Sequence, residues 1–155
     1  MSVTLDLFFS DFWADPTQQI LPKEWKKDAD DTEQLRRDYY DYTKDIFTKF
    51  KDADVPVTMV QLGNEITNGI PGAFDWDQNY TDAWGSKSKV KNRPRTACMF
   101  LNSAASAVRK VSPETKIALQ LETPNRNKYK TVMDAWEKYH VDYDVLGSSY
   151  YPFWA

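Results

Sequence analysis

The sequence predicts an α/β fold with about four parallel strands and intervening helices. Short apolar runs typical of strands alternate with longer segments whose apolar residues recur at helical spacing. This alternation is typical of a parallel sheet built from βαβ units. The connections are also unequal, since those from helix to strand are short and those from strand to helix run to about twenty, thirty and six residues. Ligand sites of such folds lie at the carboxyl ends of the strands, so the long loops mark the expected functional face.

The first half of the chain predicts two strands separated by one helix. Residues 3–9 (VTLDLFF) are a mostly apolar run, and we expect them to form the first strand. A long loop follows at 10–30, where prolines interrupt regular structure. Residues 32–51 are the first expected helix, and residues 57–63 (VTMVQLG) are the second strand. The apolar residues at helical spacing in that helix are Leu35, Tyr39, Tyr42, Ile46 and Phe50.

The second half repeats the pattern after another long loop at 64–95, which lacks clear periodicity. Helices are expected at 96–110 and 128–140, where apolar residues again recur every three or four positions. Residues 116–121 (KIALQL) and 143–151 (YDVLGSSYY) are the third and fourth expected strands. With 155 residues, the chain has room for one domain and too little for two.

Composition excludes several classes of function. A net charge of -3 provides no basic stripe, so we expect no nucleic-acid partner. No apolar stretch approaches the roughly 20 residues of a membrane span. Residues 1–4 lead straight into a strand pattern, so we expect no signal peptide in this sequence. Cys98 and His140 are the only residues of their types, which argues against disulfides, metal sites and histidine-based triads. We therefore expect no metal and no cofactor.

Aromatic residues make up 15% of the chain, more than a core of this size requires. Five of the six tryptophans fall in or after the strand-to-helix segments, and only Trp136 lies in an expected helix. Flat apolar rings with a polar rim suit pyranose sugars, which present C–H faces and hydroxyls. We expect about half of these rings to bind sugar and the rest to pack loops. The five are Trp13, Trp25, Trp76, Trp84 and Trp154.

Asn64 and Glu65 are the strongest candidate for a chemical site. They follow an expected buried strand directly, and Gly63 and Gly69 on either side permit sharp turns. A carboxyl group partly buried among aromatic rings has a raised pKa, which a general acid at neutral pH needs. A polar structural turn explains the same residues, and both interpretations stay open at this point.

Five segments along the chain resemble one known family. LGNEITNG resembles the acid/base motif of the large clan of retaining glycosidases with (β/α)8 barrels, where an Asn-Glu pair closes strand four. With their wider context, the segments resemble glycoside hydrolase family 53, the endo-β-1,4-galactanases that cut arabinogalactan. They are LDLFFSDFWADP (5–16), YDYTKD (40–45), MVQLGNEITNG (59–69), VSPETKI (111–117) and YDVLGSSYYPFW (143–154).

The resemblance implies a fold and a set of roles. The chain would be a partial (β/α)8 TIM barrel containing barrel strands 3 to 6, and 1–155 would be a single incomplete catalytic-barrel fragment, since a complete barrel needs about 250 residues. Glu65 would be the acid/base, and Asn64 would bind the sugar 2-hydroxyl. Tyr150 would orient the nucleophile. The residues expected to line sugar subsites are Asp11, Trp13 and Trp154. Loop packing remains an alternative for these tryptophans, and turn capping for Asp11.

The chain also departs from the family. Retaining hydrolysis needs a second carboxylate about 5 Å from the first, and the family supplies this nucleophile from strand seven, beyond this chain. Glu122 is the substitute available at a strand end, although the family does not use that position. Phe8 and Gln120 stand where the family usually has histidines. The segment 71–95 is longer than we expect for this family.

We therefore expect a fragment of a retaining endo-acting glycoside hydrolase that cleaves β-1,4-galactan in arabinogalactan without a cofactor. Two alternatives stay open: a sugar-binding fragment that is catalytically silent for want of the nucleophile, and a related barrel glycosidase acting on another β-linked glycan. The resemblance implies a polysaccharide partner and a secreted or extracytoplasmic parent protein.

Overall fold

A computed structural model describes residues 2–74, 93–123 and 125–153 of the chain. Within these ranges, four strands form one parallel sheet in the order β1-β2-β5-β6. The strands are β1 (Val3–Leu7), β2 (Val57–Leu62), β5 (Lys116–Glu122) and β6 (Val145–Ser149). The predicted alternation of parallel strands with helices is confirmed.

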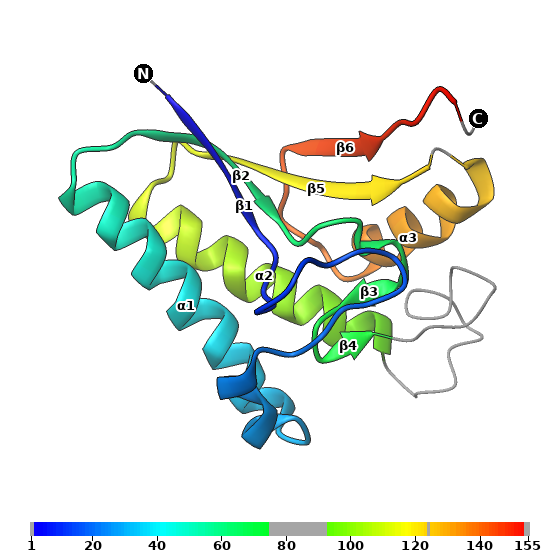
Figure 1. Ribbon diagram of the computed structural model, residues 1–155, viewed down its shortest axis with the longest axis horizontal. Helices are drawn as coiled ribbons and strands as arrows, with labels where there is room; N and C mark the ends of the chain where they lie inside the picture. Colours follow the sequence, from blue (N-terminus) through cyan, green and yellow to red (C-terminus); the bar gives the residue numbers. More distant parts are fainter. Residues whose placement is uncertain (1, 75–92, 124, 154–155) are drawn as a thin grey trace.

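Three α-helices connect the strands, and Figure 1 shows them on one side of the sheet. They are α1 (Thr32–Asp52), α2 (Arg93–Val111) and α3 (Arg126–Lys138). Asp31 caps α1 by accepting a hydrogen bond from the Gln34 N–H, and Asn125 caps α3 in the same way. The described parts of the long loops add the 3-10 helices η1 (Lys23–Asp28) and η2 (Ile66–Asn68) and the short antiparallel pair β3 (Gly69–Ile70) and β4 (Ala73–Phe74).

Several boundaries differ from the prediction. The first strand ends at Leu7, because Phe9 has a left-handed backbone (φ 55°) and turns its ring into the core, 4.6 Å from the Tyr39 ring. The fourth strand is shorter at both ends than predicted, so Tyr150 follows it. His140, expected at the end of the third helix, lies two residues beyond it with φ 51°.

The core lies between the sheet and the helices. Alternate strand residues face the helices, as the two-residue period of a strand requires, and on β1, β2 and β5 they include buried residues. On β5 the residues of the other face are buried as well. On the helix side, α1 packs along α2, and the rings of Tyr39 and Phe100 stack with their centroids 4.9 Å apart. The buried strand residues include Leu7, Val60, Leu62, Ile117, Leu119 and Leu121.

The opposite face of the sheet is polar. Asp6, Gln61 and Ala118 lie side by side in register across three strands, and Gln120 and Glu122 continue this row along β5. Partial burial raises the pKa of Asp6 to about 6, and a hydrogen bond with Gln61 acts against this rise. When such a sheet closes into a barrel, the face opposite the helices lines the interior.

None of the helices in the described ranges combines the length and the apolar character that crossing a bilayer would require.

Candidate active site

Glu65 lies in a tight turn at the carboxyl end of β2. Gly63 has φ 78°, and an added Cβ there would come within 2.5 Å of the Ile66 side chain, so the turn requires glycine. Glu65 itself is left-handed (φ 47°, ψ 50°), a conformation that costs a residue with a Cβ about 1–2 kcal/mol. Such backbone strain is concentrated at functional sites, and it persists only where surrounding contacts hold it.

Glu65 is held by two contacts, one to its main chain from β5 and one to its carboxylate from the segment after β6. Its backbone N–H donates a hydrogen bond to Gln120 Oε1 on β5 at 2.5 Å. Its carboxylate Oε1 accepts a hydrogen bond from the Tyr151 hydroxyl at 3.0 Å, just after β6. The residue is half-buried. Main chain and carboxyl group are therefore fixed separately at the carboxyl edge of the sheet, while solvent still reaches the side chain.

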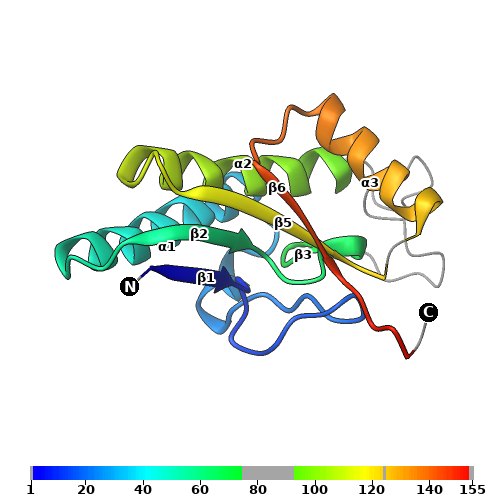
Figure 2. The ribbon, with the colours of Figure 1, turned by 90° about the horizontal axis from the view of Figure 1, so that it is seen from above.

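Asn64 ties this turn to the loop that follows β1. Its Nδ2 donates to the Ala14 carbonyl at 2.7 Å, and its Oδ1 accepts from Gln61 at 3.3 Å. Its own carbonyl accepts from Gln19 Nε2 at 3.0 Å. Figure 2 shows this loop alongside β3 at the end toward which the strand arrows point. The two predicted functional loops thus meet at one edge of the sheet.

Asp11 and Trp13 lie in the same loop, with different surroundings. Asp11 Oδ2 accepts the Lys23 backbone N–H at 2.7 Å, so this carboxylate caps the start of η1. This hydrogen bond is the turn-capping role that was the alternative to sugar binding for Asp11. The same bond leaves the other carboxylate oxygen for a ligand. The Trp13 side chain is 66% exposed. Its ring is available for stacking, as a sugar platform requires.

Trp25 is a packing residue. It is half-buried, with its ring 5.0 Å from Tyr39 and 6.0 Å from Tyr42. Trp136 is buried on α3, as expected for the one tryptophan in a predicted helix. Trp76, Trp84 and Trp154 lie outside the described residues, as does most of the long segment 71–95.

Tyr150 and Tyr151, the two neighbouring tyrosines after β6, have different surroundings. Tyr150 is 64% exposed, and its role toward the nucleophile stays a prediction. Tyr151 donates to Glu65 and was missed by sequence reasoning. A signal was present: Gly147, Ser149 and Tyr151 are spaced by two, and the first of them lies opposite Gln120 in register.

Glu122, the substitute considered for the nucleophile, is 8% exposed and forms an ion pair with Lys128 of α3. Its backbone N–H also donates to Thr67 Oγ1 at 3.1 Å. A carboxylate already paired with a cation is a poor attacking group, because its charge is stabilised before the reaction begins. In the described ranges, no cluster of three or more His, Cys, Asp or Glu side chains could hold a metal ion.

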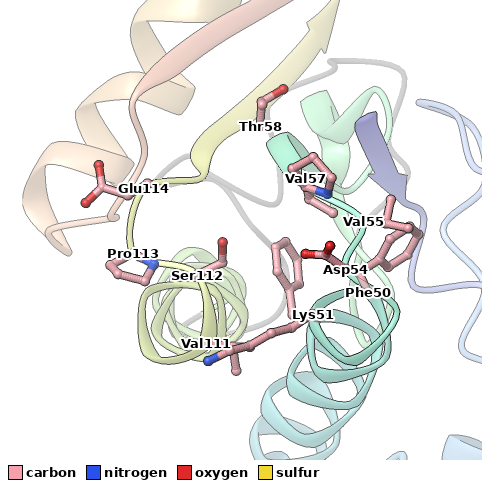
Figure 3. Close-up of a pocket in the computed structure, with 12 residues that line it drawn as sticks. Phe50, Lys51, Asp54, Val55, Val57, Thr58, Val111, Ser112, Pro113 and Glu114 are labelled. Atoms are coloured by element: carbon pink, nitrogen blue, oxygen red, sulfur yellow. The ribbon is translucent and has the colours of Figure 1, made fainter. Parts of the chain in front are cut away.

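The pocket drawn in Figure 3 lies at the other end of the sheet. Its volume is about 640 Å³, and it is lined by the last turns of α1 and α2 and by the start of β2. Lys51, Asp54 and Glu114 are its charged residues. Because ligand sites of parallel α/β folds lie at the carboxyl ends of the strands, this pocket is not the candidate site.

Comparison with known proteins supplies a family and several relatives. Residues 1–155 match the family model described as glycosyl hydrolase family 53. The endo-beta-1,4-galactanase of Bacillus subtilis (strain 168) is 34% identical over 155 residues, which cover 99% of this chain and 32% of that protein. The solved Ignisphaera aggregans GH53 catalytic domain matches with a TM-score of 0.81 and 29% identity, covering 99% of this chain and 38% of that one.

A solved structure of fungal beta-1,4-galactanases matches with a TM-score of 0.75 and 29% identity, covering 96% of this chain and 42% of that one. The chain thus spans between 32% and 42% of the length of these three relatives. Together with the four parallel strands, these matches confirm the predicted partial (β/α)8 barrel.

Proposed function

The chain belongs to glycosyl hydrolase family 53, and on that premise we propose that it is the central part of a retaining endo-β-1,4-galactanase with Glu65 as general acid/base. The observation that carries this proposal is the placement of the Glu65 carboxyl group. It stands at the carboxyl end of β2, in a strained turn, and is held by the Tyr151 hydroxyl at 3.0 Å.

The reaction would proceed in two steps. In the first, Glu65 donates its proton to the departing glycosidic oxygen while a carboxylate nucleophile attacks the anomeric carbon and forms a galactosyl-enzyme. In the second, the Glu65 carboxylate removes a proton from water, which attacks the same carbon and releases the nucleophile. Tyr151 would keep the carboxyl group in place through both steps, since its hydroxyl donates to Oε1.

The neighbouring residues would orient the sugar chain. Asn64 Nδ2 carries two hydrogens and gives one to Ala14, so the other can bind the sugar 2-hydroxyl, a contact that strengthens in the transition state. Trp13 and Trp154 would stack on the sugar rings. Asp11 would bind hydroxyls through the carboxylate oxygen that does not cap η1. A polymeric substrate cannot cross a bilayer, so we place the parent protein outside the cytoplasm.

We also propose that residues 1–155 are one incomplete fragment of this catalytic barrel, with its strands at barrel positions 3 to 6. A closed (β/α)8 barrel has eight strands, whereas the described ranges contain four in the main sheet. The nucleophile would come from another part of the parent protein.

A second candidate function is a sugar-binding fragment without turnover. The pairing of Glu122 with Lys128 favours it for the isolated chain, because the described carboxylate at the next strand end is already neutralised. Such a chain would retain Trp13 and Asn64 and would bind galactan without cleaving it.

Release of reducing sugar by the full-length parent protein tests the proposal. We expect activity on β-1,4-galactan. β-Glucan and β-mannan are the comparison substrates, and higher activity on either would show a different specificity. Glu65→Gln should lower kcat by about 100- to 10,000-fold, the contribution of a general acid/base. Glu137→Gln, an exposed substitution on α3, is the matched control. Full activity of Glu65→Gln would remove Glu65 from the mechanism.

A further inference from the structure

We propose that Gln120 is a positioning residue for Glu65, acting through the backbone of the acid/base and not through the substrate. This inference rests on the proposed function, because Glu65 must be the acid/base for its position to matter. The supporting observations are a strained turn, a buried amide that bridges two strand ends, and a glycine that makes room for that amide.

The turn needs a holding contact. Glu65 has a left-handed backbone, which residues with a Cβ adopt at a cost, and η2 begins directly after it. Gly63 can take such angles freely, whereas Glu65 cannot. Unless something external fixes the Glu65 peptide group, the turn can relax and carry the carboxyl group away from the edge of the sheet.

Gln120 provides that contact from the neighbouring strand. Its side-chain oxygen accepts the Glu65 N–H at 2.5 Å, and its Nε2 donates to Ser149 Oγ at the end of β6. The Gln120 residue is 7% exposed. The amide is locked in one orientation, because rotating it would set its NH2 group against the Glu65 N–H, and two donors cannot bond each other.

Gly147 makes this bridge possible. It lies opposite Gln120 in the register of β5 and β6, and a Cβ added there would come within 3.2 Å of Gln120 Cγ and 3.3 Å of its Cβ. The Gln120 side chain therefore lies across the backbone of β6 where a larger residue would push it aside. Gly147 does not have a left-handed φ, so alanine there would act by crowding and not by backbone strain.

The bridge has a specific kinetic consequence. Gln120 holds the Glu65 main chain and Tyr151 holds its carboxylate, so both ends of the acid/base depend on β5 and β6. Trp13 and Asn64, which would bind the sugar, are anchored to the loop after β1. Loss of the Gln120 contact should thus misplace the proton donor and leave sugar binding intact. A displacement of about 1 Å can lower the rate by about 100-fold.

The experiment compares three substitutions in the full-length protein. Gln120→Met keeps the shape and removes the hydrogen bonds to Glu65 and Ser149. We expect kcat to fall by about 30-fold or more, with KM within about threefold. Gln120→Glu restores an acceptor oxygen for the Glu65 N–H, so its kcat should be at least about tenfold higher than that of Gln120→Met. Gly147→Ala leaves Gln120 in the sequence and crowds it, and should lower kcat by about three- to tenfold.

Ser103→Ala is the matched control for general destabilisation. Ser103 is equally buried, and its hydroxyl donates to the Arg36 carbonyl, a contact between α2 and α1 that involves neither Glu65 nor Gln120. It should reduce thermal stability with no change in kcat. Equal kcat in Gln120→Met and wild type, or a rise in KM alone, would overturn the proposal, as would a kcat loss of the same size in Ser103→Ala.

Hydrogen exchange separates this inference from the proposed function. The Glu65 amide should exchange at least about tenfold faster in Gln120→Met than in wild type. The Gly63 amide, which donates to the Leu7 carbonyl at 2.8 Å, is the internal reference and should be unchanged. If the wild-type protein were inactive on galactan but the Glu65 amide still exchanged faster in Gln120→Met, the proposed function would be contradicted. The hydrogen bond between Gln120 and Glu65 would stand. Equal exchange of Glu65 in both proteins would overturn the contact itself.

Discussion

At the scale of single residues, the site depends on how one carboxyl group is held. Glu65 is half-buried, and the hydroxyl of Tyr151 donates to it although the tyrosine is 51% exposed. A carboxyl group that accepts a hydrogen bond from a neighbour loses rotational freedom before substrate arrives, which suits the acid/base role proposed for Glu65. Pre-organisation of this kind lowers the activation barrier because the group does not have to be oriented during the reaction.

Tyr151→Phe tests this contribution. We expect kcat to fall by about tenfold, equivalent to about 1.4 kcal/mol, with little change in KM, because the substitution removes a hydroxyl and retains the ring. Steady-state kinetics of the full-length protein on galactan provide the measurement. Tyr143→Phe is the control, since Tyr143 packs its ring against Trp136, 5.2 Å away, instead of against Glu65. An unchanged kcat would show that the hydroxyl does not orient the acid/base.

At the scale of secondary-structure elements, a charged network fixes the helix layer to the amino ends of the strands. Arg109, near the end of α2, donates two hydrogen bonds to Asp142 at 2.8 and 3.0 Å and another to Asp144 at 3.0 Å. Asp144 also accepts the Ile117 N–H of β5 at 2.8 Å. The Ile117 hydrogen bond is the largest cause that lowers the pKa of Asp144, with Arg109 contributing.

Arg109→Lys should destabilise the chain by about 1 kcal/mol, because a lysine cannot reproduce the planar fork. A group with a lowered pKa stabilises the fold above its unfolded value and loses that contribution as the pH falls through its folded value. The stability difference between the two proteins should therefore shrink below about pH 4. Urea unfolding at pH 7 and pH 3 provides the comparison. A difference that grew on acidification would contradict this assignment.

The elements also show how far sequence reasoning reaches. The periodicity of apolar residues predicted each of the four main strands and three helices of the described ranges, because burial of one face imposes it. The pattern did not predict where β1 ends, since Phe9 leaves the strand through a left-handed turn that places its ring against Tyr39, Tyr42 and Trp25. It also missed η1, η2 and the pair β3–β4, which are too short to carry a period.

The candidate site was predictable in part for a similar reason. Asn64 and Glu65 follow directly from the strand and glycine pattern, and the structure places them at the predicted edge. The partners Gln120, on β5, and Tyr151, just after β6, lie 55 and 86 residues away from Glu65 in the chain. Contacts over such separations depend on sheet order and register, which a single sequence does not contain.

At the scale of the whole molecule, the described helices cover one side of the sheet (Figures 1 and 2). The other side carries the polar residues Asp6, Gln61 and Gln120. β1 and β6 are the outer strands of this sheet. In a closed barrel these two strands would each pair with a further strand, and the polar face would line the interior. This arrangement agrees with the proposal that the chain is one part of a larger barrel.

We expect the isolated 155-residue chain to be catalytically silent on galactan, because retaining hydrolysis needs a second carboxylate and Glu122 is paired with Lys128. Unpaired edge strands should also make it associate. A reducing-sugar assay beside light scattering measures both properties, with the full-length parent as the positive control. Robust sugar release by the isolated chain would contradict the silence prediction and with it the proposed source of the nucleophile.

Kinetics of Glu65→Ala in the full-length protein with two substrates test directly whether Glu65 is the acid catalyst. An acid catalyst is needed when the leaving group is a sugar hydroxyl and much less when it is an activated phenolate. We expect hydrolysis of galactan to fall by about 100-fold or more, while formation of the galactosyl-enzyme from a dinitrophenyl galactobioside continues at close to the wild-type rate. Equal losses on both substrates would contradict this role and would make Glu65 a structural residue.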